Sequence, residues 1–115
     1  MTVYFGFAFA DSMIPGDALL RRKVLSQEEA VELVHKGVEP CLNPSHKATI
    51  DAMAVRCGIV VPIPPTAPKV ELQVGDSVIV LSVRGLPRLD ATRHEYTAEE
   101  IAKATFVFSL WTRIE

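Results

Sequence analysis

The chain has 115 residues, 49% of them hydrophobic, and a formal net charge of -2. This length and this hydrophobic content predict a single folded domain over residues 1–115 and exclude a disordered chain. The slightly acidic balance excludes a polycation that coats long DNA or RNA, so a site for an anion must be local. The sequence has no apolar run near the ~18 residues of a membrane span and no signal peptide, so we expect a cytoplasmic protein without membrane contact.

The first predicted elements are two strands and a helix. Val3 to Phe9 is rich in β-branched and aromatic residues, which predicts a buried strand, and Leu19 to Leu25 predicts a second, more polar strand. Ser26 and the following Gln-Glu-Glu form a capping-box sequence that opens a helix over Gln27 to Lys36. Gly37 suits the left-handed position just past the end of such a helix.

A second helix is predicted after a short extended stretch over Val38 to Leu42. Asn43 can cap this helix, Pro44 suits its first turn, and Gly58 follows its last residue, Cys57. Apolar residues recur along the helix at a spacing that places them on one face, with a histidine at the head of this stripe, and we expect the stripe to meet the core. The stripe comprises His46, Ile50, Met53, Ala54 and Cys57.

Prolines interrupt the middle of the chain. Ile59 to Ile63 is apolar and predicts a strand, and Lys69 to Gln73 predicts another, whereas the prolines confine the stretch around them to an edge or a loop. Ser77 to Val83 is the clearest strand of the sequence. Arg84 to Glu95 lacks an apolar period and predicts a basic loop of the kind that often carries function.

The last predicted elements are a short helix and a strand. Thr97 and the following Ala-Glu-Glu form a second capping box, which opens a helix through Ala104, and Thr105 to Trp111 predicts the closing strand. Strands interleaved with helices in this order predict an α/β (mixed α+β) domain. We expect a single mixed β-sheet of about five or six strands flanked by three short helices.

Several kinds of enzyme site are missing from the sequence. Cys41 and Cys57 lack CxxC spacing and are too few for a zinc site, so we interpret both as buried thiols. There is no P-loop, no GxSxG elbow and no metal-ligand spacing of His and Asp residues. We therefore expect neither a metal nor another cofactor.

His46 has two interpretations. The start of a helix presents unsatisfied, positively polarised amides that bind phosphate, and an imidazole held there could protonate the leaving 5′ oxygen of a phosphodiester. Alternatively, His46 is a core residue that completes the apolar stripe. Thr49 likewise either offers its hydroxyl to the same ligand or bonds back to the preceding turn. His35, near the end of the first helix, is expected on the surface.

The basic loop offers further candidates. Arg84, Arg88 and Arg93 either clamp phosphate oxygens, for which the planar guanidinium is suited, or belong to a solvated loop. His94 and Glu95 form an acid/base pair only if these sequence neighbours point the same way.

Together these segments resemble the viral ring nucleases, small anti-CRISPR proteins that act against type III systems and were first met in crenarchaeal viruses. The likeness runs from Val3 to Trp111 and includes the "AFADSMI" turn, the "LSQEEAVELVHKG" helix, the "SHKATIDAMAVRCGI" segment, the "VGDSVIVLSV" strand and "TAEEI" before the last strand. Its specific motif is Gly-His-x-x-Thr, in which Ser45 replaces the glycine while His46 and Thr49 are kept.

The resemblance implies a function and a mechanism. Members of this family form homodimers that hold cyclic tetra-adenylate, a second messenger of type III CRISPR immunity, across the subunit interface. They cleave it without metal: a ribose 2′ hydroxyl attacks the adjacent phosphate, and the histidine matching His46 protonates the leaving oxygen. The resemblance also implies ligand contacts from Ser45, Lys47 and Thr49.

The sequence departs from the family in two places. The family's serine after the first strand falls at Ala10, which leaves Asp11 or Ser12 as substitutes in ligand binding. The family's Arg-x-x-Glu-Gly loop has no clean counterpart. The residues that would replace its arginine and its acid are Arg84, Arg88, Asp90 and Glu95.

Three hypotheses follow. The first is a homodimer that binds a cyclic oligoadenylate such as cyclic tetra-adenylate and cleaves it slowly, with His46 as general acid and Arg84 or Arg88 as phosphate clamp. The second is a sponge that sequesters a cyclic nucleotide without cutting it. The third is a small protein-interaction module with no nucleotide site, in which His46 belongs to the core.

Overall fold

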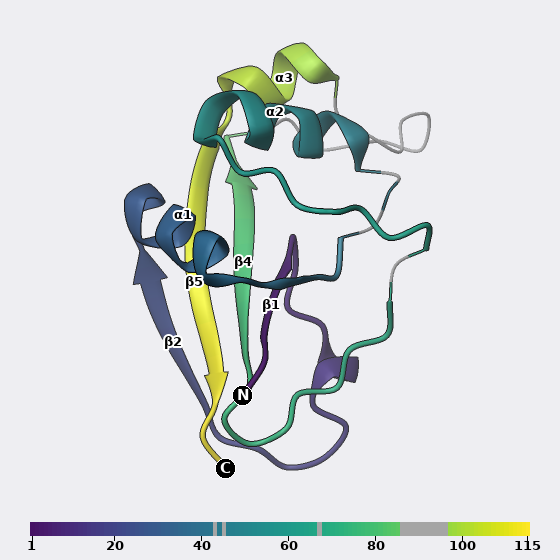
Figure 1. Ribbon diagram of the computed structural model, residues 1–115, viewed down its shortest axis with the longest axis vertical. Helices are drawn as coiled ribbons and strands as arrows, with labels where there is room; N and C mark the ends of the chain where they lie inside the picture. The colour runs from purple at the N-terminus through teal and green to yellow at the C-terminus, as the bar shows by residue number, and fades with distance from the viewer. Residues whose placement is uncertain (43, 45, 67, 86–96) are drawn as a thin grey trace.

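The structure, a computed structural model, describes residues 1–42, 44, 46–66, 68–85 and 97–115. Its centre is one five-stranded sheet in the order β2-β5-β4-β1-β3 (Figure 1). The strands are β1 (Val3–Gly6), β2 (Leu20–Leu25), β3 (Glu39–Pro40), β4 (Ser77–Arg84) and β5 (Thr105–Arg113). The helices are α1 (Gln27–Lys36), α2 (Lys47–Cys57) and α3 (Ala98–Lys103), with a 3-10 helix, η1 (Asp11–Met13). The predicted fold class is confirmed.

The sheet mixes parallel and antiparallel pairs. β1 is parallel to β4 on one side and to β3 on the other, with Tyr4 opposite Val78. β5 is antiparallel to β4 and to β2, and its Trp111 lies opposite Val78 and Arg22. Parallel strands end at the same edge, so the C-terminal ends of β1 and β4 point to one end of the molecule, where α2 and α3 also lie (Figure 1).

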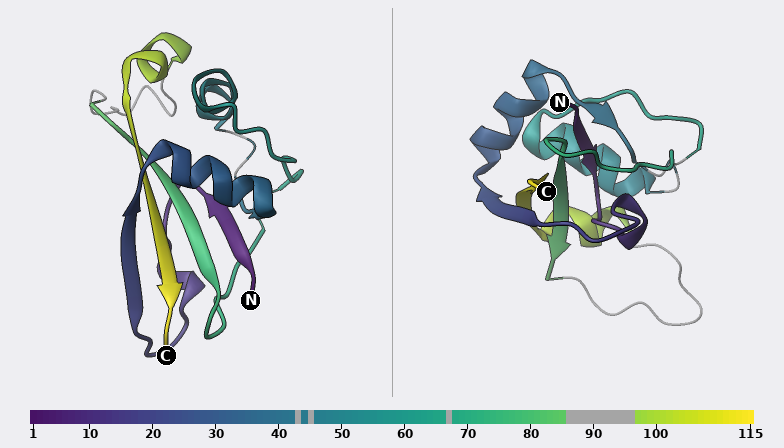
Figure 2. Two further views of the ribbon diagram at one scale, coloured as in Figure 1. Left: turned by 60° about the vertical axis from the view of Figure 1, so that its left-hand side comes forward. Right: turned by 90° about the horizontal axis from the view of Figure 1, so that it is seen from below.

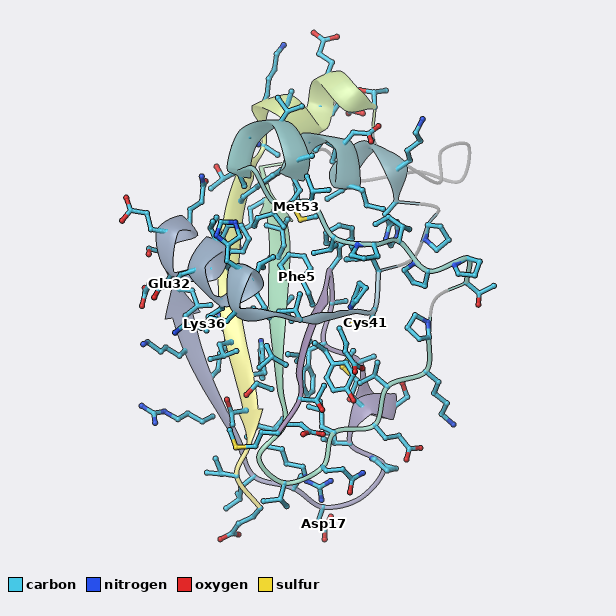
Figure 3. All side chains as sticks on the ribbon, viewed as in Figure 1. Phe5, Asp17, Glu32, Lys36, Cys41 and Met53 are labelled. Atoms are coloured by element: carbon cyan, nitrogen blue, oxygen red, sulfur yellow. The ribbon has the colours of Figure 1, made fainter. Side chains whose placement is uncertain are left out.

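We call the side of the sheet that α1 and α2 cover the first face (Figure 2). Phe5 of β1 and Met53 of α2 are both fully buried and lie between the sheet and the helices (Figure 3). Burial of such side chains contributes about 1.5–3 kcal/mol each. The buried residues of this core are Phe5, Leu25, Ala30, Leu42, Met53, Cys57, Ile59, Val61, Ile79, Leu81 and Phe108.

The opposite side, which we call the second face, is covered by irregular segments rather than by α-helices. Met13 of η1 packs there against Val78 and Val80 of β4, together with Val70 and Leu72. Partly buried aromatic and thiol side chains complete this smaller core, and they are Tyr4, Phe9, Cys41 and Trp111.

The two strands predicted around the prolines are wrong. Residues 59–63 and 69–73 belong to no strand, although their side chains alternate as a strand's would: Ile59 and Val61 are buried whereas Val60 is 78% exposed. Prolines cannot donate to a ladder, and here the segments pack against the rest of the fold through side chains. Two backbone hydrogen bonds hold the second segment: the Leu72 N–H donates to the Met13 carbonyl oxygen at 2.7 Å, and the Gln73 carbonyl oxygen accepts from the Asp76 N–H at 2.9 Å.

The predicted helices are confirmed, with one change at the start of α2. In the capping box of α1, the Ser26 hydroxyl accepts from the Glu29 amide and Glu29 accepts from the Ser26 amide, and Thr97 and Glu100 do the same at α3. Gly37 (φ 113) and Gly58 (φ 68) end α1 and α2 with the positive φ that favours glycine. α2 begins at Lys47 rather than after Asn43, which lies outside the described residues.

The longest helix, α2, has 11 residues. In the part of the chain that the structure describes, no helix is long and apolar enough to cross a membrane.

Arg56 joins the C-terminal ends of α2 and α3. Its Nη1 donates to the carbonyl oxygens of Ile101 at 3.1 Å and Ala104 at 2.8 Å, and its guanidinium lies 3.9 Å from the centre of the Phe106 ring. A cation is favourable at the C-terminal end of a helix because the last carbonyls carry a partial negative charge. Arg56 therefore holds α3 against α2 at the start of β5.

Asp76 fixes the turn that precedes β4. The carboxylate accepts hydrogen bonds from the backbone amides of Thr2 at 3.0 Å and Gln73 at 2.9 Å, and the side chain is buried. These hydrogen bonds hold the pKa of the Asp76 carboxyl below its ordinary value. One carboxylate thus ties the N-terminal end of β1 to the turn that leads into β4.

Replacing Asp76 by Asn is expected to lower the free energy of unfolding at pH 7 by about 1–3 kcal/mol, because two part-buried hydrogen bonds from backbone amides lose their charged acceptor. A depressed pKa stabilises the fold above the unfolded-state pKa, and this stabilisation is lost as the pH falls through the folded-state pKa. Urea denaturation should therefore give a difference between wild type and Asp76→Asn that shrinks in acid. A difference that stays constant from neutral pH to acid would contradict this account.

Gly6 ends β1 at a close approach to Cys41, the residue after β3. A Cβ atom at position 6 would lie 2.8 Å from Cys41 Sγ, a distance that real Cβ atoms do not tolerate. Cys41 is held in place by two donations to the Phe5 carbonyl oxygen, from its amide at 2.8 Å and from its thiol at 3.1 Å. Glycine at position 6 therefore leaves the space that the Cys41 side chain occupies beside β1.

The variant Gly6→Ala is expected to lose about 1–3 kcal/mol of stability through this steric overlap. Gly16→Ala is the matched control, because a Cβ atom at position 16 meets nothing within 4 Å; we expect a change within about 0.5 kcal/mol. Adding Cys41→Ala to Gly6→Ala should restore part of the loss in thermal denaturation. Additive effects of the two substitutions would refute the contact.

Candidate functional site

The end of the sheet at which β1 and β4 terminate carries the candidate site. In open sheets with parallel strands, ligands bind beyond the C-terminal ends of the strands. Phe7 follows β1 directly, Arg84 is the last residue of β4, and His46 precedes α2. The topology thus brings the ends of three elements to one end of the molecule (Figure 1).

His46 is exposed and occupies the N-cap position of α2, with φ -85 and ψ 45 outside the helical region. Its ring lies against the ring of Phe7, with 5.8 Å between the centroids and 49° between the planes. Phe7 is partly buried and packs against the core of the first face. The imidazole is therefore held on one side by an aromatic ring while the residue stays open to solvent.

The prediction that His46 heads the buried stripe of the second helix is wrong. α2 begins at Lys47, the residue after His46, so His46 does not follow the helical spacing of the residues after it. Met53 and Cys57 are buried and Ile50 packs against the same core, as the stripe predicts.

The start of α2 differs from the starts of α1 and α3. The His46 side chain accepts no hydrogen bond from the first turn of α2, and this turn contains no acidic residue. By contrast, α1 and α3 each have a capping box and two glutamates in the first turn. Lys47 is exposed at the first position of α2, and Thr49 is partly buried. Within the described residues, the positively polarised end of α2 is therefore offset by no carboxylate in its first turn.

Arg84 lies at the same end of the sheet but on the other face. Side chains alternate along a strand, so Arg84 shares the second face with Val80 and Val78, whereas Phe7 packs on the first face. Arg84 is exposed and lies opposite Thr105. The remaining residues of the predicted basic loop lie outside the described residues, and these are Arg88, Asp90, Arg93, His94 and Glu95.

The structure does not bring Ala10, Asp11 and Ser12 next to His46. All three are exposed at or within η1, whose Met13 packs on the second face. Figure 1 and the left-hand view of Figure 2 place η1 further down the sheet than the start of α2. Ser45, the remaining candidate, lies outside the described residues.

The other titratable candidates lie apart from this site or are unreactive. Burial raises the pKa of the Cys41 thiol and of the Cys57 thiol, which keeps both protonated near neutral pH. Cys57 is buried as predicted, whereas Cys41 is only partly buried. His35 is exposed near the end of α1, as predicted. The described residues contain no group of three or more His, Cys, Asp or Glu side chains that could hold a metal ion.

Phe7 is the site residue that the sequence did not reveal. It was predicted as one more apolar residue of a strand, but β1 ends at Gly6 and Phe7 instead supports the His46 ring. The only sequence signal was its place at the end of a buried strand, where side chains often face a site.

Comparison with known proteins gives a fold but no family. No family model and no curated protein matches the sequence. Among solved structures, the chain is similar to B116 of Sulfolobus turreted icosahedral virus, with a TM-score of 0.66 and 17% sequence identity over 97% of this chain and 99% of that chain. The two proteins therefore share a fold along nearly their whole length, and the neighbour is a protein of a Sulfolobus virus.

Proposed function

We propose that this chain binds a cyclic oligoadenylate at the start of α2 and cleaves it slowly, which blunts type III CRISPR signalling. The ligand in this proposal is cyclic tetra-adenylate, and the acting species is a homodimer. The fold shared with a protein of a Sulfolobus virus agrees with a family first met in crenarchaeal viruses.

The observation that carries the proposal is the open start of α2 beside an exposed histidine. The His46 side chain does not cap the amides of the first turn of α2, and this turn contains no acidic residue. Lys47 adds a positive side chain at the same place. Such a helix start binds phosphate oxygens through its amides and its dipole. His46 stands at this position with its ring braced by Phe7, so it is oriented before a ligand arrives.

The chemistry is an in-line transfer within the ligand. The ribose 2′ oxygen forms a bond to the adjacent phosphorus and loses its proton to solvent. The bond from phosphorus to the 5′ oxygen breaks, and His46 donates a proton to that oxygen as general acid. The products are linear and end in a cyclic phosphate. Thr49 and the amides of the first turn of α2 bind the non-reacting phosphate oxygens.

A homodimer would explain how one cyclic tetra-adenylate molecule contacts both the general acid and the arginine clamp. A ring of four identical nucleotides has two-fold symmetry, and a two-fold dimer offers the same residues to opposite phosphates. Within one subunit, Arg84 lies on the second face and His46 lies against the first face. In this proposal the clamp of Arg84 or Arg88 closes on the ligand from a different side than the acid.

The test is cleavage of cyclic tetra-adenylate in EDTA, followed by chromatography. Replacing His46 by Ala should lower the single-turnover rate by about 10²–10⁴-fold, the usual contribution of a general acid, while the ligand still binds. His35→Ala is the matched control, because His35 is an exposed histidine in the last turn of α1 rather than at the start of α2. Equal loss in both variants, or no cleavage by wild type, would reject the catalytic role.

Sequestration without cleavage is a second candidate function. The observation that favours it is the separation of Arg84 from the Phe7–His46 pair on opposite faces of the sheet, which would leave the transition state without its clamp. A ligand that binds only the folded state raises its stability, by about 2.7 kcal/mol at 100 times Kd. A sponge would show this stabilisation and release uncut ligand after heating. No stabilisation by cyclic di-, tri-, tetra- or hexanucleotides would reject both functions in favour of a protein-interaction module.

A further inference from the structure

We propose that the open edge of β2 binds an acidic, extended peptide segment as an additional strand. β2 is the outermost strand of the sheet, and among the described residues only β5 pairs with it. Figure 1 and the left-hand view of Figure 2 both show its outer side free of other drawn segments. The opposite edge of the sheet, β3, has only 2 residues, so β2 is the longer open edge.

The backbone of β2 offers a regular set of unpaired groups. The Ile114 amide donates to the Leu19 carbonyl oxygen at 2.9 Å, so Leu19 bonds toward β5. The next residue, Leu20, lies opposite Arg113 in the register. In an antiparallel ladder, residues alternate between bonding to the partner and pointing away from it. The N–H and C=O groups of Leu20, Arg22 and Val24 therefore point outward, in the spacing that an added strand requires.

The side chains along this edge are cationic. Arg21, Arg22 and Lys23 are consecutive and exposed. The register with β5 puts Arg22 on the second face, where its guanidinium lies 5.7 Å from the centre of the Trp111 ring. Arg21 and Lys23 project on the first face, and Lys23 lies 3.6 Å from Glu29. An added strand would meet positive charge on both of its faces.

These charges select against a second copy of this chain. Antiparallel pairing of two β2 strands about Arg22 would place Arg22 opposite Arg22 and Arg21 opposite Lys23, and like charges directly opposite each other are destabilising. An acidic strand turns the same positions into opposite-charge pairs. In other proteins, cationic edge strands serve to repel further strands. Here the edge also carries Val24, an apolar side chain that is 57% exposed. This side chain would be stabilised by packing against an added strand.

The register specifies the partner. A strand antiparallel to β2 meets Val24 first, followed by Lys23, Arg22 and Arg21. Complementary residues are therefore a β-branched residue followed by three acidic residues, read from the N-terminus. A suitable probe is a fluorescent synthetic peptide with Thr-Val-Glu-Asp-Glu-Thr at its centre.

The experiment is fluorescence anisotropy with the full chain. The peptide should bind, more weakly as salt rises, and the double variant Arg21→Glu, Lys23→Glu should weaken binding by at least about tenfold. The double variant Lys36→Glu, Lys103→Glu makes the same change in net charge on exposed helical positions and should bind like wild type. Circular dichroism checks that each variant is folded.

A change in the peptide separates strand addition from charge attraction without altering the protein. N-methylation of the amides that face β2 keeps every charge but removes the hydrogen bonds, and it should abolish binding. No binding of the unmodified peptide, or equal binding of the methylated one, would overturn the proposal. Self-association of wild type that is lost in Arg22→Glu would overturn it in favour of a second copy. The variant His46→Ala should bind the peptide normally, so this result is independent of the proposed nucleotide site.

Discussion

β1 lies inside the sheet, hydrogen-bonded in parallel to β4 on one side and to β3 on the other. At the end of β1 the Cys41 amide and thiol both donate to the Phe5 carbonyl oxygen, and Gly6 leaves room for the thiol. The chain that leaves β1 and the chain that leaves β3 are thereby fixed close together. Phe7 directly follows β1, and His46 lies six residues after the end of β3. The pairing of β1 with β3 thus brings the parts of the chain that carry these two rings together.

The three helices divide into two with satisfied starts and one with an open start. At α1 and α3 the capping box satisfies the amides of the N-cap and N3 residues, and the two glutamates of each first turn offset the positive end of the helix dipole. α2 receives no such side-chain cap from His46 and carries Lys47 instead of an acid. Burial of Met53 and Cys57 holds α2 against the core, and no side-chain cap at its N-cap residue, His46, is needed to keep it there.

The sequence was informative where structure is decided locally. A capping box needs only residues three apart, and both predicted boxes are present. Around Val60 the buried and exposed side chains do alternate, but the predicted strand is absent because a strand also needs a hydrogen-bonding neighbour, which no local pattern supplies. The prediction that His46 belongs to the buried stripe was wrong for a related reason. Helical spacing identified the stripe, but it could not say on which residue the helix begins. The contact with Phe7 joins residues far apart in the sequence and follows from the pairing of β1 and β3.

In the function that we propose, the start of α2 binds a phosphate of a cyclic oligoadenylate. The most direct measurement is an amide NMR titration with cyclic tetra-adenylate that follows the backbone N–H signals of Lys47, Ala48 and Thr49. We expect these signals to move the furthest, together with the ring signals of His46 and Phe7, because the amides exchange water for phosphate oxygens. Unchanged signals at these residues, with shifts confined to another surface, would contradict it.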